Sequence, residues 1–162
     1  MSDIWGWVED NIIDPVKQFC DDISEDVDNY DKDNKDPNNV FNSNYFSSYN
    51  ETLVVITPFD SSFSFGFIGL SHVQKNTNTL NHEYGHKLQL EERGWGEYIT
   101  DVAVPSFTAN MAHRTGNLPY DYYGSPWEAE ADIKGGVKRN KDNTPWPEGS
   151  YDSYWDLIKL FF

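Results

Sequence analysis

The chain has 162 residues, of which 38% are hydrophobic and 16% aromatic, and its formal net charge is −15. This length fits one domain with its own core, and the aromatic content excludes a chain that is disordered throughout. The acidic balance argues against nucleic acid and against anionic membrane surfaces as partners.

The N-terminal part is expected to lie outside the main folded domain. Residues 1–20 carry apolar side chains at roughly helical spacing, and Pro15 interrupts that pattern. Acidic residues dominate 21–36, which is typical of a linker or a solvated arm. A calcium loop is the sharper interpretation, but the central glycine and the final glutamate of an EF-hand loop are missing. We therefore expect an N-terminal helix and acidic arm over 1–40 and the main domain over 41–162.

Nothing in the sequence predicts a membrane span, an export signal or a disulfide. No apolar run reaches the roughly 18 residues of a transmembrane helix. The first seven residues lack the basic and then apolar order of a signal peptide. Cys20 is the single cysteine, which excludes an internal disulfide and a cysteine-rich zinc site. Export, if it occurs, is expected to use another route.

The main domain is predicted to begin with strands. Residues 52–57 (TLVVIT) are rich in β-branched side chains and predict a short strand. Phenylalanines alternate with small residues over 63–67, which predicts a second strand with one apolar face. Turn-forming residues lie between the two runs, so we expect a hairpin and a small antiparallel sheet.

Helices are predicted to follow. The pattern favours a helix over 79–93 that stops at Gly94, then a helical segment over 98–111 that Pro105 splits. A further helix starts after Ser125 and ends at the Gly135–Gly136 pair, and the aromatic tail over 154–162 is expected to be a docking segment.

The run His82-Glu83-Tyr84-Gly85-His86 carries the most specific chemical signal. A spacing of four places the two histidines one turn apart on the same helical face, where both imidazoles can reach one Zn²⁺ ion. Glu83 lies beside that face, where a carboxylate can take a proton from a water molecule that the metal polarises. A solvated polar helix is the alternative, but Gly85 is costly in the middle of such a helix and calls for a structural reason.

A catalytic zinc site needs a third protein ligand, and residues 127–132 offer three carboxylates. Glu128 and Asp132 share one helical face, whereas Glu130 points away from both. We favour Glu128 as the ligand and Asp132 as the acceptor for the N–H of a ligating histidine. Glu130 and Asp132 remain alternative candidates for the third ligand. Glu128 has an alternative role in a capping box with Ser125.

Three other residues are candidates for lining the cleft or for stabilising a transition state. His72 and His113 are the remaining histidines, and zinc hydrolases often set such a donor against the developing oxyanion. Tyr123 precedes the Glu128 helix and is a candidate for the cleft wall. Surface or packing roles are the simpler interpretation for all three.

At these residues the chain resembles the gluzincin metallopeptidases, whose signature joins HExxH to a downstream glutamate in an E-x-x-x-D setting. The resemblance implies that His82, His86 and Glu128 bind zinc. It also implies that Glu83 is the base and that Asp132 supports a ligating histidine.

A second resemblance covers residues 52–162, through the runs at 57–71, 79–90, 118–132 and 143–162. These runs look like a zincin-like domain found at the C-terminal ends of Rhs/YD-repeat and other polymorphic-toxin proteins. The resemblance implies a delivered effector or toxin peptidase with an immunity protein as partner. The chain departs from those proteins in that it carries no YD repeats.

The sequence thus predicts an α+β, zincin-like fold in which a small antiparallel sheet packs beside a two-helix metal site. It predicts a zinc-dependent metallopeptidase that acts on a protein or peptide substrate. The alternative is a catalytically silent module that zinc stabilises and that binds a partner.

Overall fold

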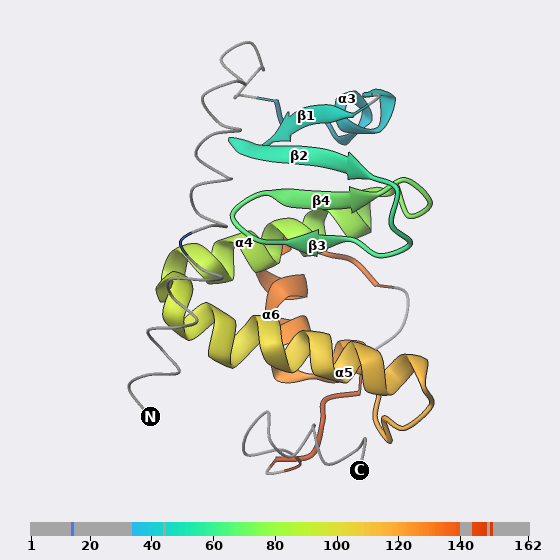
Figure 1. The fold of residues 1–162 in the computed structure, drawn as a ribbon, viewed down its shortest axis with the longest axis vertical. Coiled ribbons are helices and arrows are strands. Elements are labelled where there is room, and N and C mark those ends of the chain that lie inside the picture. The colour runs from blue at the N-terminus through green and yellow to red at the C-terminus, as the bar shows by residue number, and fades with distance from the viewer. Residues whose placement is uncertain (1–13, 15–33, 44, 140–143, 149, 151–162) are drawn as a thin grey trace.

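The computed structural model describes residues 14, 34–43, 45–139, 144–148 and 150 of the chain, and Figure 1 shows their arrangement. In chain order the elements are α3 (Pro37–Asn42), β1 (Phe46–Tyr49), β2 (Thr52–Thr57), β3 (Phe63–Ser64), β4 (Ile68–Ser71), α4 (Thr77–Tyr98), η2 (Ile99–Ala103), α5 (Val104–Arg114), η3 (Tyr122–Gly124) and α6 (Pro126–Gly135). The predicted α+β class is confirmed.

The four strands form one mixed sheet in the order β1-β2-β4-β3. β1 and β2 form an antiparallel hairpin, in which Asn50 and Glu51 both have positive φ at the turn. β2 pairs with β4 in parallel, and the short β3 pairs with β4 in antiparallel fashion. The wholly antiparallel sheet and the hairpin between 52–57 and 63–67 were therefore wrong predictions.

The second apolar run departs from the prediction because the chain reverses at Gly66. Its φ of 72° lies in the left-handed region that glycine adopts without strain, and the N–H of Phe65 donates to the carbonyl of Phe67 at 2.9 Å. This turn folds β3 back on β4 and leaves it as the last strand of the sheet order. The alternation of phenylalanines over 63–67 marks this turn rather than a continuous strand.

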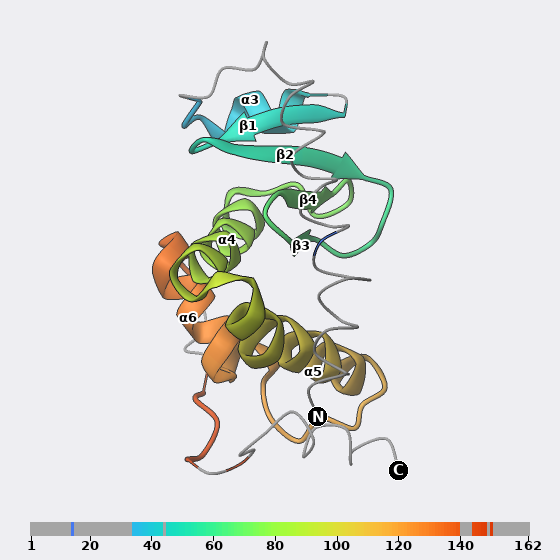
Figure 2. The same cartoon turned by 60° about the vertical axis from the view of Figure 1, so that its left-hand side comes forward.

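Among the described residues, the buried apolar side chains form three clusters, two of which include residues of α4. Between α3, the sheet and α4, the buried side chains include Val40, Val54, Ile68 and Leu80. A second cluster joins the end of α4 to η2, and a third joins α5 to η3 and Trp146. Figure 2 shows the resulting arrangement, in which α4 lies between the sheet and α5 and has α6 along its side.

α4 begins and bends where the sequence indicates. Asn76 is the N-cap, and its side chain accepts a hydrogen bond from the N–H of Thr79. Gly94 has a φ of 74° and a ψ of 169°, which breaks the helix at the predicted stop before the chain resumes a helical path. The predicted segment over 98–111 is divided into the π-helical η2 and α5, and Pro105 lies in the first turn of α5.

Several predictions fall on residues outside the described part. These are the helix over 1–20, most of the acidic arm over 21–36 and the docking segment over 154–162. The domain boundary near residue 41 also stays a prediction, although Val40 is already fully buried in the core. Within the described residues, no helix combines the length and the apolar character needed to cross a membrane.

Candidate metal centre

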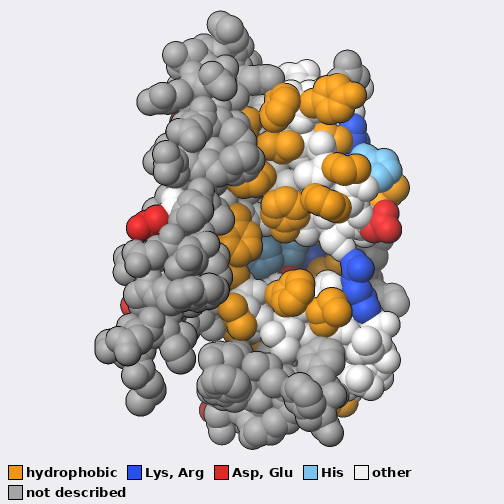
Figure 3. Space-filling model, in the orientation of Figure 1, with side chains coloured by type: hydrophobic (Ala, Val, Ile, Leu, Met, Phe, Trp, Pro, Cys, Tyr) orange, Lys and Arg blue, Asp and Glu red, His pale blue; other side chains and the backbone are white. Residues whose placement is uncertain are grey.

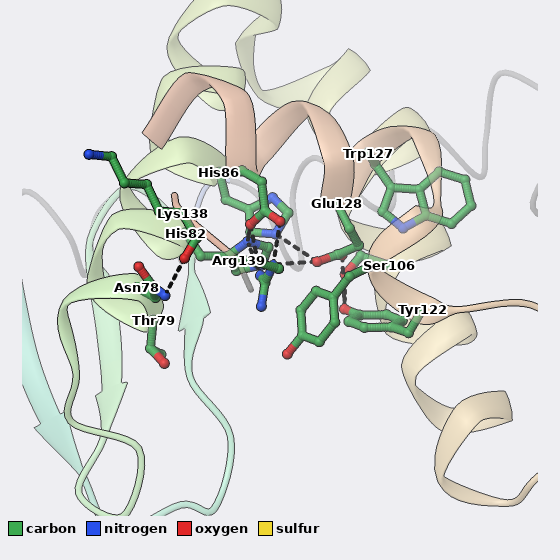
Figure 4. A network of polar contacts seen from close by, with 12 residues as sticks. Asn78, Thr79, His82, His86, Ser106, Tyr122, Trp127, Glu128, Lys138 and Arg139 are labelled. Carbon is green, nitrogen blue, oxygen red and sulfur yellow. Dashed lines mark hydrogen bonds and ion pairs between the residues drawn. The ribbon is translucent and has the colours of Figure 1, made fainter. Parts of the chain in front are cut away.

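The candidate metal centre consists of three buried side chains that α4 and α6 bring together (Figure 4). His82 and His86 project from the same face of α4, with ring centroids 4.7 Å apart. Glu128 comes from the first turn of α6. Its Oε2 atom lies 2.9 Å from Nε2 of His82 and 3.5 Å from Nε2 of His86. The ligand atoms of all three lie within 4.8 Å of one another, which is close enough to bind one metal ion.

The close approach of the two helices explains the glycine in the HExxH run. A β-carbon on Gly85 would lie 1.9 Å from the carbonyl oxygen of Ala131 in α6. One on Gly135 would lie 1.8 Å from the carbonyl oxygen of Asn81 in α4. The backbones therefore approach closely at two points beside the centre, and neither point can hold a larger residue without movement.

The two carboxylate oxygens of Glu128 have different surroundings. Oε1 accepts a hydrogen bond from the hydroxyl of Tyr122 at 2.8 Å, and the Oγ atom of Ser106 lies 3.0 Å from that hydroxyl. Oε2 is buried, and its nearest polar neighbours are the Nε2 atoms of His82 and His86, at 2.9 and 3.5 Å. A buried carboxylate oxygen needs positive charge beside it, which a protonated imidazole or a bound cation can supply. The alternative capping role is not seen, because Ser125 makes no side-chain capping bond.

Asp132 lies behind His82, where it was predicted. Its Oδ1 atom is 2.7 Å from Nδ1 of His82. Arg139 donates to both carboxylate oxygens of Asp132, at 2.5 and 2.7 Å, and its guanidinium lies 3.7 Å from the centre of the Tyr123 ring. Arg139 therefore holds Asp132 in place, with its Nη2 atom 3.3 Å from Nδ1 of His82, and Asp132 in turn orients the imidazole.

Gln89 has the same role behind His86, and the sequence-based interpretation missed it. Its Oε1 atom lies 2.7 Å from Nδ1 of His86. Its Nε2 atom donates to the carbonyl oxygen of Trp127 at 2.8 Å and to Oε2 of Glu130 at 3.0 Å. Because both of these partners can only accept, the amide orientation is fixed. The available signal was the spacing of three from His86, which places Gln89 on the same helical face.

These contacts determine which ring nitrogens face the centre. The oxygens of Asp132 and Gln89 can only accept, so Nδ1 of each imidazole carries the proton. With a metal bound, the rings would be neutral and their Nε2 lone pairs would face the centre. Two imidazole nitrogens and one carboxylate oxygen, each oriented by a second partner, are a donor set that fits Zn²⁺.

The pKa values of the same groups reflect their mutual attraction. Burial alone lowers the pKa of His82, but its hydrogen bond with Asp132 and the nearby carboxylate of Glu128 outweigh this effect and raise the pKa to about 10. Burial favours the neutral form of Glu128, yet His86 and His82 hold its pKa well below the ordinary value. Glu128 is thus a carboxylate that attracts positive charge to the centre.

Glu83 is placed beside the centre at the base of a cleft. Two adjoining cavities of about 420 and 410 Å³ both include His82 and Glu83 in their lining. Figure 3 shows the hollow, with histidine at its base and hydrophobic side chains gathered above and below it. Burial raises the pKa of Glu83, against the opposing effect of the two histidines. A carboxylate with a raised pKa is a stronger proton acceptor.

The remaining candidate residues fall in different places. His72 is exposed, lies outside both cavities and has its Nδ1 atom 3.2 Å from the carbonyl oxygen of Thr57. His113 and Tyr123 both line the smaller cavity. Tyr122, which also precedes the Glu128 helix, lines both cavities and contacts Glu128. Glu130 lies outside the cluster and pairs with Arg93 at 2.6 Å.

No protein-family model matches this chain, and no curated protein or solved structure matches it either.

Proposed function

We propose that this protein is a zinc-dependent metallopeptidase. The observation that carries the proposal is the convergence of Nε2 of His82, Nε2 of His86 and the buried Oε2 of Glu128, with Glu83 beside them in an open cleft. Three protein ligands leave a coordination position free, as catalytic zinc sites require. The buried nitrogen and oxygen donors favour zinc over calcium or magnesium, which prefer oxygen ligands only.

Each residue of the centre has a separate task in the proposed reaction. When bound, zinc polarises a water molecule and the scissile carbonyl. Glu83 takes the proton of the attacking water and delivers it to the leaving amine nitrogen. Asp132 and Gln89 keep the two imidazoles in one orientation throughout.

β3 is the candidate for holding an extended peptide. It ends the sheet order, and both of its residues, Phe63 and Ser64, line the larger cavity. The unpaired edge of a strand can bind a peptide through backbone hydrogen bonds. Such pairing would lay the peptide between β3 and the centre.

The resemblance to polymorphic-toxin domains extends this proposal to a biological role. It suggests that the peptidase is delivered as an effector or toxin domain and that an immunity protein blocks it. A peptidase of this kind is expected to be inhibited by a small partner that covers the cleft.

The decisive experiment compares the zinc-loaded protein with its Glu83→Gln variant. We expect this substitution to preserve zinc content and fold, because amide and carboxylate have the same shape, and to lower the cleavage of casein by about 10² to 10⁴-fold. Zinc content is measured by elemental analysis, and cleavage is measured with and without a chelator. Glu91→Gln, on an exposed part of the same helix, is the matched control and should keep full activity.

The alternative of a metal-stabilised binding module predicts a different result. Zinc would then stabilise the fold, but neither casein nor a peptide library would be cut by any variant. Full activity in the Glu83→Gln variant would also contradict the proposed role of Glu83.

A further inference from the structure

The two cavities above the centre differ in chemical character. The larger cavity is lined by apolar side chains that include Phe65, Val102, Phe107 and Met111. The smaller cavity is lined by polar and basic side chains that include Asn76, His113, Arg114 and Arg139. The two meet at His82 and Glu83, so the cleft is apolar on one side of the centre and polar on the other.

One face of α5 forms the wall that connects the two sides. Phe107, Asn110, Met111 and Arg114 follow one another at helical spacing, and all four line the larger cavity. Asn110 and Arg114 also line the smaller cavity. At 1.5 Å per residue, Phe107 and Arg114 are separated by about 10 Å along the helix axis, which is about three residues of an extended peptide.

The charge of the cleft is opposite to that of the chain. The formal net charge is −15, yet Glu83 is the only acidic side chain among the described residues that line the two cavities. Arg114 is exposed and forms no ion pair with a described residue; its guanidinium donates to Oγ of Ser61 on the opposite wall. Most of its five N–H donors are therefore left for a ligand.

We propose that this cleft selects an extended peptide with a large apolar side chain on one side of the scissile bond and a carboxylate side chain on the other. The apolar side chain would be buried near Phe107 and Met111, and the carboxylate would pair with Arg114. This inference rests on the proposed peptidase function for the position of the scissile bond. The repulsion from the acidic surface is screened beyond about 8 Å at physiological salt, whereas a pair at Arg114 is in direct contact.

The test uses the zinc-loaded full chain carrying Glu83→Gln, so that binding is measured without cleavage. The probes are four fluorescent peptides with the cores Phe-Ala-Asp, Asp-Ala-Phe, Phe-Ala-Lys and Lys-Ala-Phe, which cover both chain directions. We expect one of the Asp peptides to bind about three- to tenfold more tightly than its Lys counterpart, as is usual for one partly exposed ion pair.

Variants in the wall identify the source of this preference. Arg114→Gln in the same background should abolish the preference for Asp, and Arg114→Glu should reverse it. Phe107→Ser should weaken the binding of the Asp peptide and of its Lys counterpart by the same factor. Lys35→Gln removes one positive charge at an exposed site outside both cavities and should preserve the preference. Equal binding of the Asp and Lys peptides, or a preference that survives Arg114→Gln, would overturn the inference.

The same peptides separate this inference from the proposed function. If the Glu83→Gln protein prefers Asp through Arg114 but the native protein cuts nothing, cleft recognition stands and the peptidase proposal fails. If the native protein cuts casein but treats Asp and Lys peptides alike, the peptidase proposal stands and the proposed selectivity is wrong.

Discussion

Nδ1 of His86 lies 2.7 Å from Oε1 of Gln89, three residues further along the same helix. One helix thus supplies a candidate metal ligand and the group that orients it. Gln89 is in turn fixed by the carbonyl of Trp127 and the carboxylate of Glu130. The orientation of His86 therefore depends on contacts that reach into α6.

Gln89→Ala should weaken zinc binding by about 10- to 100-fold, the usual effect of removing a residue that orients a metal ligand. The imidazole of His86 would lose its acceptor and could rotate or change tautomer. Competition with a chromophoric chelator measures the affinity. Glu97→Ala, at an exposed position of the same helix, should leave the affinity unchanged, and an equal effect of both substitutions would show that the loss is not specific to His86.

The identity of the third ligand can be tested with two glutamates of α6. Glu128→Gln should lower zinc affinity by about 100-fold or more, because the amide replaces a charged ligand oxygen with a weak neutral donor. Glu130→Gln should retain zinc, since Glu130 lies outside the cluster and pairs with Arg93. The chelator competition assay measures both variants. The reverse order of effects would assign the ligand to Glu130.

Gly85→Ala should destabilise the protein strongly, because the new methyl group would lie 1.9 Å from the carbonyl oxygen of Ala131. Overpacking of this kind typically costs about 1–3 kcal/mol of unfolding free energy. Urea denaturation of the metal-free protein measures the effect. Gly96→Ala is the matched control, because a β-carbon there meets no atom within 4 Å. Alanine favours the helix more than glycine does, so the free energy of unfolding should stay the same or rise by up to about 1 kcal/mol.

Zinc should raise the melting temperature in a concentration-dependent way. A ligand that binds only the folded state adds about 2.7 kcal/mol of stability at a free concentration 100 times its Kd. Differential scanning fluorimetry with increasing zinc and with a chelator measures the shift. The Glu128→Gln variant should show little response, and an equal shift in that variant would place the bound zinc elsewhere in the protein.

Local sequence patterns predicted the parts of the site that lie within single helices. The HExxH run lies in a helix that is interrupted at Gly94, and α6 begins at Pro126 and is capped by Gly136 in the left-handed conformation. The spacing of Glu128 and Asp132 also placed both on the face of α6 that meets α4. Helical periodicity contains this information because side chains three or four residues apart share a face.

Apart from the meeting of the two ligand helices, features that depend on long-range contacts were not predicted. The parallel pairing of β2 with β4 has no local signature, because a strand pattern shows which face is buried but not which strand lies beside it. Arg139 lies beyond the end of α6 and reaches Asp132 only through the path of the loop. Tyr122 looked like one aromatic among several until the fold placed its hydroxyl against Glu128.

The contact between Gly85 and Ala131 determines the spacing of the imidazoles and the carboxylate at the point where two backbones meet. The exposed loop between α5 and η3 takes no part in that contact and only has to connect the two elements. Loop closure becomes costlier only slowly with length. Insertions between positions 115 and 121 should therefore leave the triad in place, whereas a methyl group at position 85 would shift it.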